Sequence, residues 1–475
     1  MKRFLWLCVV VVLFLICTGC GDTFRPVIIP NPPVFPDPRA SHSVVVISDN
    51  NTDPTQDPPQ SNRGSAMSVN VSGDTVTSIV DVELAPVHAV QQTATQVLVA
   101  NHSVPGQLAD SVTKLTFNGT QIAAAIKISL PTGSAPSFVA STENTTGYVL
   151  LPNYVPDPVN NPGVVVPSVG VINTSSNALA VTFAVGSNPV AMAETPDGRK
   201  LYVANGGDGT VSSFNTVDRS PRNPPIALSS PPLWIVARSD SQRVYVLEAN
   251  GSIATLDTSA TSGPDNLTES GFSLPGAAYM VYDGHLNRLY VPSTDLSDGV
   301  NPARLAVVDV SGSLPGTPII VKMDTVPPSA RNAQDPCAVT AAATLNAAAA
   351  AALPDGSRVY LGSYYTDAAG NICPQVTAIN TSSNTVKTAT AVPGFSGLFP
   401  FTPPVCGFTR FPFLMAAAGD SSRVYLSSCA GGNVNVVNTA TDQYLLNLPA
   451  PNSSRPPIIG AQPPPQNPVY MIAGP

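Results

Sequence analysis

The sequence predicts an all-β protein in which one small sheet is repeated around an axis. The clearest copy of the repeat is Val190 to Thr216, where turn signals separate three short strands. Pro196-Asp197-Gly198 is typical of a hairpin turn, Lys200 to Ala204 is an apolar strand, and Val211 to Phe214 returns after a glycine-rich turn. Three such strands cannot bury their own faces, so the unit requires neighbours of the same kind.

The second strand of this unit recurs along most of the chain. A basic residue, an apolar residue, a tyrosine and an apolar residue follow one another in the strong copies, which begin at Lys200, Arg243, Arg288, Arg358 and Arg423. Weaker copies are Gln96 to Val99, Thr146 to Val149 and Pro468 to Met471. These strands are apolar on both alternating faces, which is typical of sheets covered on both sides by other sheets.

The third strand of the unit ends in an Asn-Thr or Asp-Thr pair, as in Asp257-Thr258 and Asn438-Thr439. Such pairs start turns because their side chains bond to nearby backbone groups. Tyr202 and Tyr245 are 43 residues apart, and Tyr245 and Tyr290 are 45 apart. This spacing is the length of a four-stranded blade.

Counting the copies favours eight blades. Seven complete modules lie between Val87 and Ala450, and Ile458 to Pro475 forms an incomplete one. Met67 to Leu84 supplies the missing third and fourth strands, and Ser43 to Ser48 is a further strand of the closing blade. Joining the two chain ends in one blade removes the open edges of the ring. Seven blades remain the alternative if one weak module is an insertion.

The segment Tyr202-Val203-Ala204-Asn205 resembles the YVTN-type β-propeller repeat, a relative of the lactonase-like propellers. By pattern, the resemblance extends over roughly nine-tenths of the mature chain. It implies a single β-propeller of seven to eight blades, and it brings no catalytic motif with it. Leu98 and Gly147 depart from the pattern, so the early blades are the ones that the resemblance defines least.

The first residues, 1–19, have the features of a secretion signal. Lys2 and Arg3 precede the apolar stretch Leu5 to Ile16, which is short for a membrane span. The following Cys17-Thr18-Gly19-Cys20 resembles a bacterial lipobox, which implies that Cys20 is lipid-modified, with palmitate among its acyl chains, and becomes the new N-terminus. An ordinary cleaved signal and an uncleaved anchor are the alternatives. The residue after Cys20 is Gly21 and not aspartate, which resembles lipoproteins that are passed on to the outer membrane.

Residues 20–41 form a proline-rich tether, and residues 42–475 form the predicted propeller. Six prolines between Phe24 and Arg39 favour an extended conformation that holds the ring away from the bilayer. Charged residues make up only 11% of the chain, against about 25% in an average soluble domain. The net charge of −8, without a basic cluster, argues against nucleic-acid binding.

The polyalanine run Ala347 to Ala352 has two interpretations. Alanine is the best helix former, which favours a short helix. The alignment with Val190 to Glu194 instead predicts an innermost strand, where crowding near the axis requires small side chains, and we adopt this interpretation. Ala338 to Asn346 is then an insertion with some helix.

The cysteines predict two disulfides in an exported protein. Four remain besides Cys20, and we favour the pairs Cys337 with Cys373 and Cys406 with Cys429 because each lies within or beside one module. Two other pairings are possible from the sequence. No C-x-x-C occurs and no histidine is close in sequence, so neither a metal site nor a redox site is expected.

Few residues qualify as catalytic groups. His42, His88, His102 and His285 are isolated, and His88 is the one that opens an inner strand and is placed to face the central channel. Asp197, Asp283 and Asp355 are explained as turn formers. The loop Asp367 to Asn371 lacks the regular ligand spacing of a calcium loop and is interpreted as a surface loop. The sequence predicts no catalytic residue, no metal and no cofactor.

These features favour a lipid-anchored binding or interaction scaffold in the cell envelope, whose partner is an unidentified protein or small molecule. The alternative is a lactonase-like propeller enzyme acting on a small periplasmic substrate, and a third possibility is an envelope structural protein without a discrete ligand. Clustered carboxylates or histidine in the central channel would favour the enzyme, whereas a neutral lining would favour binding.

Overall fold

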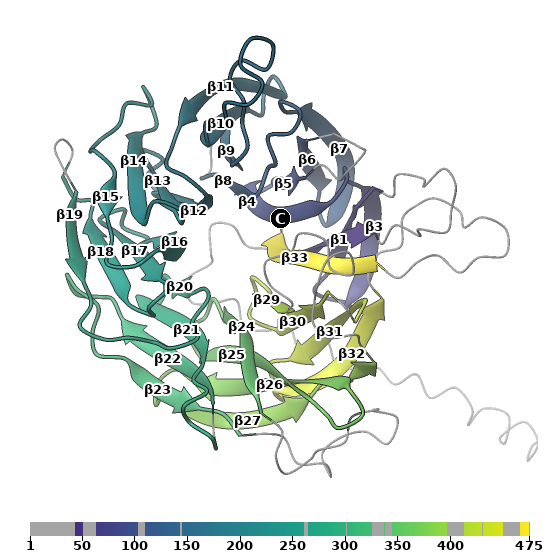
Figure 1. The fold of residues 1–475 in the computed structure, drawn as a ribbon. Helices are drawn as coiled ribbons and strands as arrows, with labels where there is room; N and C mark the ends of the chain where they lie inside the picture. The colour runs from purple at the N-terminus through teal and green to yellow at the C-terminus, as the bar shows by residue number, and fades with distance from the viewer. Residues whose placement is uncertain are drawn as a thin grey trace, which may run out of the picture. The chain divides into compact units, whose positions relative to one another are not determined.

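The strands of the computed structural model form eight antiparallel sheets around one axis, which makes the protein an eight-bladed β-propeller (Figure 1). The structure describes residues 43–50, 63–102, 110–142, 145–260, 265–300, 302–324, 337, 344–396, 413–429, 431–449 and 466–474. By its contacts the chain divides into Met1–Pro32 and Pro33–Pro475. The first of these units, with Cys20, lies outside the described residues, and all described strands belong to the second.

In blades two to eight, four strands follow one another from the axis outwards in chain order. Blade two is β4 (Pro86–Thr93), β5 (Gln96–Asn101), β6 (Ser111–Asn118) and β7 (Gln121–Ser129); blade three is β8 (Phe138–Ala140), β9 (Thr146–Leu151), β10 (Ser168–Asn173) and β11 (Ala178–Ala184). Blade four is β12 (Pro189–Glu194), β13 (Lys200–Asn205), β14 (Thr210–Asn215) and β15 (Ile226–Ala227); blade five is β16 (Pro232–Ala237), β17 (Arg243–Glu248), β18 (Ile253–Asp257) and β19 (Asn266–Glu269).

The other half of the ring repeats this order. Blade six is β20 (Val281–Asp283), β21 (Arg288–Thr294), β22 (Ala303–Asp309) and β23 (Ile319–Lys322). Blade seven is β24 (Asn346–Ala352), β25 (Arg358–Thr366), β26 (Asn371–Asn380) and β27 (Thr385–Ala391), with the short β28 (Phe395–Ser396) also paired to β26. Blade eight is β29 (Phe413–Ala417), β30 (Arg423–Ser428), β31 (Asn433–Asn438) and β32 (Gln443–Pro449).

Blade one closes the ring with strands from both ends of the chain. From the axis outwards it contains β33 (Gln466–Gly474), β1 (Ser43–Asn50), β2 (Ser65–Asn70) and β3 (Thr75–Asp81). The pairing of β33 with β1 confirms the predicted closure of the ring by the two chain ends. It also confirms eight blades, the larger of the two predicted numbers.

One register prediction was wrong. Pro468 to Met471 was aligned with the second strands, but β33 is the innermost strand, and the second position is taken by Ser43–Asn50. The error has a physical reason. The first and second strands of a blade are both flanked by neighbouring sheets, so both are apolar on two faces, and a short apolar run around a tyrosine does not distinguish them. Tyr470 accordingly faces the axis, unlike the tyrosines of the true second strands.

The core lies between neighbouring blades. The tyrosines of the strong second strands are fully buried, with 0% exposure at Tyr202, Tyr245, Tyr290, Tyr360 and Tyr425. All six residues of β13 are buried, whereas in the outermost β27 only one of seven is. The second strands therefore supply the main hydrophobic contacts between blades, because each is covered on both faces.

The polyalanine run forms the innermost strand β24, which confirms the strand interpretation over the helix. Ala349, Ala350 and Ala351 are 1–5% exposed and pair with β25. Local helix propensity was overridden because the segment pairs along its length with β25, and this pairing requires an extended backbone. Most of the predicted insertion before it, residues 338–343, lies outside the described residues.

The two departures from the repeat at Leu98 and Gly147 compensate for each other. A Cβ atom at Gly147 would be 2.5 Å from Cδ1 of Leu98 in the preceding blade. Leu98 is 0% exposed and stands where the strong copies have tyrosine. The missing side chain in blade three therefore makes room for the leucine of blade two.

Polar bonds also join neighbouring blades, and they involve the basic residue and the threonine of the repeat. The basic residue that begins a second strand donates to the carbonyl of the threonine that follows the third strand of the next blade: Arg288 to Thr381 (2.6 Å), Lys200 to Thr258 and Arg358 to Thr439. In blade two, whose second strand begins with Gln96, Lys114 of the third strand donates to the Thr174 carbonyl (2.8 Å) instead. The threonine hydroxyl then donates to the first turn of its own blade, as Thr258 does to the Ser241 carbonyl (2.8 Å) and Thr439 to the Ser421 carbonyl (2.7 Å).

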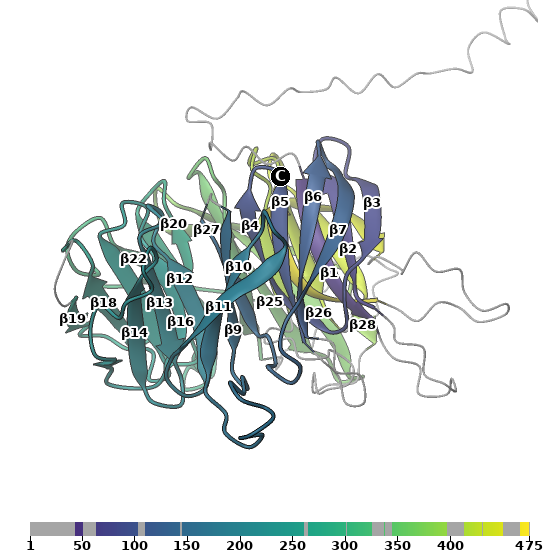
Figure 2. The same cartoon turned by 90° about the horizontal axis from the view of Figure 1, so that it is seen from above.

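Seen from above, the ring presents two ends where the strand connections gather (Figure 2). Because the strands of a blade are antiparallel, one end carries the first and third turns of each blade, and the other carries the second turns and the connections between blades. Among the described residues, no helix is long and apolar enough to cross a membrane.

Candidate axial binding site

A cavity of ≈ 320 Å³ lies against the inner strands of five blades. Its wall contains His88 of β4, Phe138 of β8, Glu194 of β12, Trp234 of β16 and Tyr470 of β33. Figure 1 shows these strands facing the common axis of the ring. The site thus depends on the closed ring, because segments almost 400 residues apart in sequence, around His88 and Tyr470, form one wall.

Aromatic rings form a continuous arc along this wall. His88 stacks on Phe138 with ring centroids 3.7 Å apart and on the other side meets Tyr470 at 4.3 Å. Phe138 meets Trp234 at 5.6 Å with an interplanar angle of 70°. Behind the wall, Trp234 in turn meets Tyr279, which precedes β20 and is not among the residues that line the cavity, at 6.1 Å and 78°. Edge-to-face pairs of this kind lock the orientation of each ring.

The His88 ring is held as part of the wall. It is 7% exposed, and Nδ1 accepts the backbone N–H of Val139 at 3.4 Å. An acceptor Nδ1 corresponds to the neutral tautomer with its proton on Nε2. The structure therefore places the predicted channel histidine on the axial cavity, stacked between two aromatic residues.

Glu194 brings a carboxylate to the same wall. It ends β12, is 6% exposed, and its Oε2 accepts the backbone N–H of Thr142 at 2.7 Å. This bond connects the inner strand of blade four to the chain that follows the inner strand of blade three. Among the described residues lining the cavity, Glu194 is the one carboxylate, and none is lysine or arginine.

The remaining histidines do not join this site. His42 lies outside the described residues. His285 is exposed in the turn after β20, where its backbone N–H donates to Asp283 Oδ1 at 2.9 Å. His102 lies at the end of blade two, and burial lowers its pKa below the ordinary value, partly opposed by the nearby Asp110 carboxylate.

The predicted turn-forming aspartates act as such. Asp283 accepts the N–H groups of His285 and Leu286, and Asp355 accepts the N–H and the hydroxyl of Ser357. Asp197 accepts the N–H of Arg199 at 3.2 Å and the hydroxyl of Thr195. In the loop after β25, Asp367 Oδ1 accepts the N–H groups of Ala369 and Asn371. These carboxylates stabilise turns and leave the axial site to Glu194.

The Cys337–Cys373 disulfide favoured from the sequence is present. Asp367 lies beside it, and the three side chains form a cluster of metal-ligand type. The two sulfurs are joined to each other, however, and a metal requires free thiolates. Cys429 is also disulfide-bonded, and its predicted partner Cys406 lies outside the described residues.

A second cavity, of ≈ 470 Å³, lies between blades four and five at the end that carries the first and third turns. Two of its basic residues bond to the next blade, and its aspartates Asp197, Asp218 and Asp240 bond within their own turns. Arg222 pairs with Asp265 at 3.1 Å, with both side chains almost fully buried, and Lys200 donates to the carbonyls of Thr258 and Ala260. This cavity is therefore explained by the bonding that assembles the ring.

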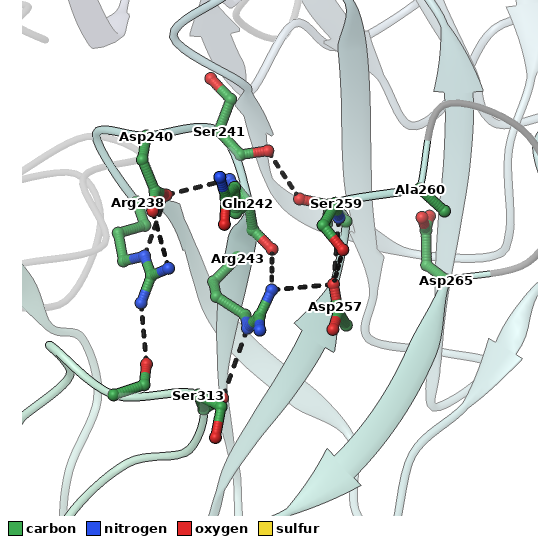
Figure 3. A network of polar contacts seen from close by, with 12 residues as sticks. Arg238, Asp240, Ser241, Gln242, Arg243, Asp257, Ser259, Ala260, Asp265 and Ser313 are labelled. Carbon is green, nitrogen blue, oxygen red and sulfur yellow. Dashed lines mark hydrogen bonds and ion pairs between the residues drawn. The ribbon is translucent and has the colours of Figure 1, made fainter.

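Figure 3 shows the neighbouring part of this network in blade five. Arg238 pairs with Asp240 at 2.7 Å, and Arg243 pairs with Asp257 at 2.8 Å. Arg243 also donates to the Ser313 carbonyl in blade six at 3.3 Å. The same pattern of a basic residue reaching the next blade thus continues around the ring.

Sequence reasoning missed Phe138, Glu194 and Trp234 as site residues. None of them belongs to the repeated second strand on which the modules were aligned. Phe138 and Trp234 stand two residues after a proline on their inner strands, the position that His88 and Tyr470 occupy in their own blades. Aligning the first strands in place of the second would have exposed these two aromatic residues facing the axis.

The geometry is better suited to binding than to catalysis. Acid–base or nucleophilic chemistry requires two or more reactive groups that converge on one substrate atom. The wall described here is mostly apolar and aromatic, with His88 held between rings and Glu194 bonded to backbone. A partly apolar cavity with a few fixed polar groups is typical of small-molecule sites.

Comparisons with known proteins identify the fold. No family model matches the chain, and no curated protein matches it. Two solved structures of AztD from Citrobacter koseri, one of them of the apo form, are 9% identical to it, with TM-scores of 0.54 and 0.55. The matches cover 90% and 91% of this chain and 97% of AztD in both cases. A candidate 6-phosphogluconolactonase from Bacteroides uniformis is 12% identical over 74% of this chain and 97% of its own, with a TM-score of 0.46. At these identities the likenesses concern the fold alone.

Proposed function

We propose that this protein is a cell-envelope binding protein: a β-propeller tethered through lipid on Cys20, with the axial cavity as its ligand site. The observation that carries the proposal is the cavity wall, which five blades build from ordered aromatic rings and one carboxylate. A volume of ≈ 320 Å³ fits a small molecule or one side chain of a partner protein.

The sequence supports the location in the envelope. The lipobox-like Cys17 to Cys20 follows a charged and then apolar segment, and a proline-rich tether separates it from the first strand. The disulfide Cys337–Cys373 is consistent with an oxidising compartment outside the cytoplasm. Gly21 after the lipidated cysteine favours the outer membrane as the location of the protein. The proposed partners are this membrane and an unidentified ligand.

Tryptophan fluorescence tests the ligand site directly. The sequence contains two tryptophans, Trp6 and Trp234, so a Trp6→Phe chain reports on the cavity alone. We expect members of a panel of small organic molecules to change the Trp234 emission saturably. A Val90→Trp substitution in the Trp6→Phe background should fill part of the cavity while keeping Trp234, and by calorimetry it should abolish that binding. If no compound gives saturable binding to the parent chain, the proposed ligand site is wrong.

The second candidate is a lactonase-like enzyme, and the presence of both His88 and Glu194 on one wall is what favours it. Hydrolysis of lactones by the purified protein, followed by proton release, distinguishes the two functions. Under the binding proposal the rate equals that of buffer. Turnover that disappears in His88→Gln or Glu194→Gln, with the fold intact by circular dichroism, would establish the enzyme.

A further inference from the structure

From the chemistry of the cavity wall we infer that the axial site takes an organic cation, an alkylammonium or quaternary ammonium group, with its charge facing Glu194 and its methyl groups against the aromatic arc. This inference rests on the proposed ligand site and specifies the chemical class of its ligand.

The charge of the wall favours a cation. Glu194 is 6% exposed and supplies a formal negative charge, and no lysine or arginine is among the described residues that line the cavity. Charges interact more strongly in such a protein environment than in water. An anionic ligand would therefore be repelled, whereas a cation would be attracted to the buried carboxylate.

The aromatic rings favour an organic cation over a metal ion. Phe138, Trp234 and Tyr470 line the same cavity as Glu194. Aromatic faces attract cations through their quadrupole, tryptophan most strongly, and aromatic walls recognise quaternary ammonium groups. Calcium requires six to eight oxygen ligands, and zinc prefers three or four side chains of histidine, cysteine or carboxylate type. One carboxylate and one stacked histidine do not meet either requirement.

The ring orientations give the cation more than one face to contact. Phe138 and Trp234 both line the cavity and lie 70° apart, so their rings present their faces in different directions. A tetrahedral ammonium group can contact such surfaces on several sides, whereas a flat neutral ring can stack on only one or two of them. The cavity volume of ≈ 320 Å³ leaves room for the alkyl chain that carries the charge.

The test compares choline with 3,3-dimethylbutan-1-ol, which has the same shape but carries carbon in place of the charged nitrogen. Both are titrated into the full-length Trp6→Phe chain in detergent, and Trp234 emission is recorded. We expect choline to bind at least about tenfold more tightly than the alcohol, since a desolvated cation–π contact exceeds the free energy of one decade in affinity.

Two variants identify the residue responsible. Glu194→Gln keeps an oxygen that can accept the Thr142 N–H but removes the charge, and should weaken choline binding about tenfold while leaving the alcohol unchanged. Glu269→Gln, on the exposed outer strand β19, is the matched control and should change neither. Equal binding of both probes, or choline binding that survives Glu194→Gln, overturns the cation assignment but leaves the ligand site. If neither probe nor any panel compound binds, the site itself is overturned.

Discussion

Arg423 of blade eight and Asp74 of blade one form an ion pair although they are 349 residues apart in the sequence, with Arg423 Nε 3.0 Å from Asp74 Oδ2. The hydroxyl of Tyr425, two residues further along β30, donates to the other oxygen of Asp74 at 3.2 Å. The bond joins the last blade to the blade that contains both chain ends. Asp74 stands directly before the fourth strand of its blade, the position of Asp442 in blade eight, which pairs in the same way with Arg358 of blade seven at 2.6 Å.

Removing this carboxylate should destabilise ring closure. Asp74→Ala leaves the buried Tyr425 hydroxyl and the largely buried Arg423 without their acceptor, which should cost about 2 kcal/mol or more. The measurement is the free energy of unfolding from urea titration. Asp218→Ala, which removes an exposed turn aspartate of blade four, is the control and should stay within about 0.5 kcal/mol. Equal effects of the two substitutions would show that the bond between Arg423 and Asp74 contributes nothing to the free energy of unfolding.

The pair of Leu98 and Gly147 gives a prediction about packing between blades. Gly147→Ala should cost about 1–3 kcal/mol because its Cβ would overlap Leu98 Cδ1. Leu98→Ala alone should cost about 2–5 kcal/mol because it opens a cavity. The double variant should lose less free energy of unfolding than the sum of the two single losses, since the shortened side chain makes room for the new methyl group. Urea titration of all four proteins measures the coupling, and strictly additive losses would contradict the proposed complementarity.

The sequence predicted the features of the fold that every blade repeats. The motif that contains Tyr202 recurs because each second strand must fill the same space between two sheets, and the Asp-Thr and Asn-Thr endings recur because each third strand must turn and bond to its neighbour. Such constraints apply to each blade separately, so they are visible as a period. The register of Tyr470 could not be predicted in the same way, because the closing blade consists of two chain ends and neither end contains a whole module.

The candidate site was predictable only in part. His88 could be placed at the channel because it opens an inner strand of an aligned module. The rings of Phe138 and Trp234 stand two residues after a proline, as His88 does, but this position lies on the first strands, whereas the modules were aligned on the second strands. Glu194 is visible in the sequence but is separated from His88 by 106 residues, and only the ring geometry brings both to one cavity.

The buried tyrosines predict how stability depends on alkaline pH. Burial raises the pKa of Tyr245 to about 12 and, together with the neighbouring Asp265 and Asp74 carboxylates, raises the pKa values of Tyr202 and Tyr425 further. In the unfolded chain tyrosine ionises near pH 10. Between these values the unfolded state binds fewer protons than the folded one, so the free energy of unfolding should be unaffected below pH 10 and fall as the pH rises above it.

Absorbance of phenolate at 295 nm measures this directly. We expect the buried tyrosines, among the 13 of the chain, to ionise only when the fold is lost, at the same pH at which the far-ultraviolet circular dichroism changes. In urea they should all ionise near pH 10. Complete ionisation near pH 10 with the circular dichroism unchanged would contradict the burial of these hydroxyls.

The Cys337–Cys373 disulfide connects residues 36 positions apart, and reducing it should destabilise the protein. Closing a loop of this length restricts the unfolded chain by about 3–4 kcal/mol in the chain-entropy view. A Cys337→Ser, Cys373→Ser double variant should therefore unfold at lower urea concentration than the parent in oxidising buffer. Adding dithiothreitol should affect the double variant less than the parent. Identical urea midpoints for both proteins in oxidising buffer would show that the bond does not stabilise the fold.

The lipid anchor is tested by substituting the cysteines near the N-terminus one at a time. Cys20→Ala should abolish incorporation of labelled palmitate and move the protein from the membrane fraction to the soluble fraction, because the acyl chains on Cys20 provide the proposed attachment. Cys17→Ala is the matched control three residues earlier and should keep both the label and the membrane association, since the lipobox pattern places the modification on the cysteine after the small residue. Membrane retention of Cys20→Ala, or loss of the label in Cys17→Ala alone, would assign the anchor to another part of the chain.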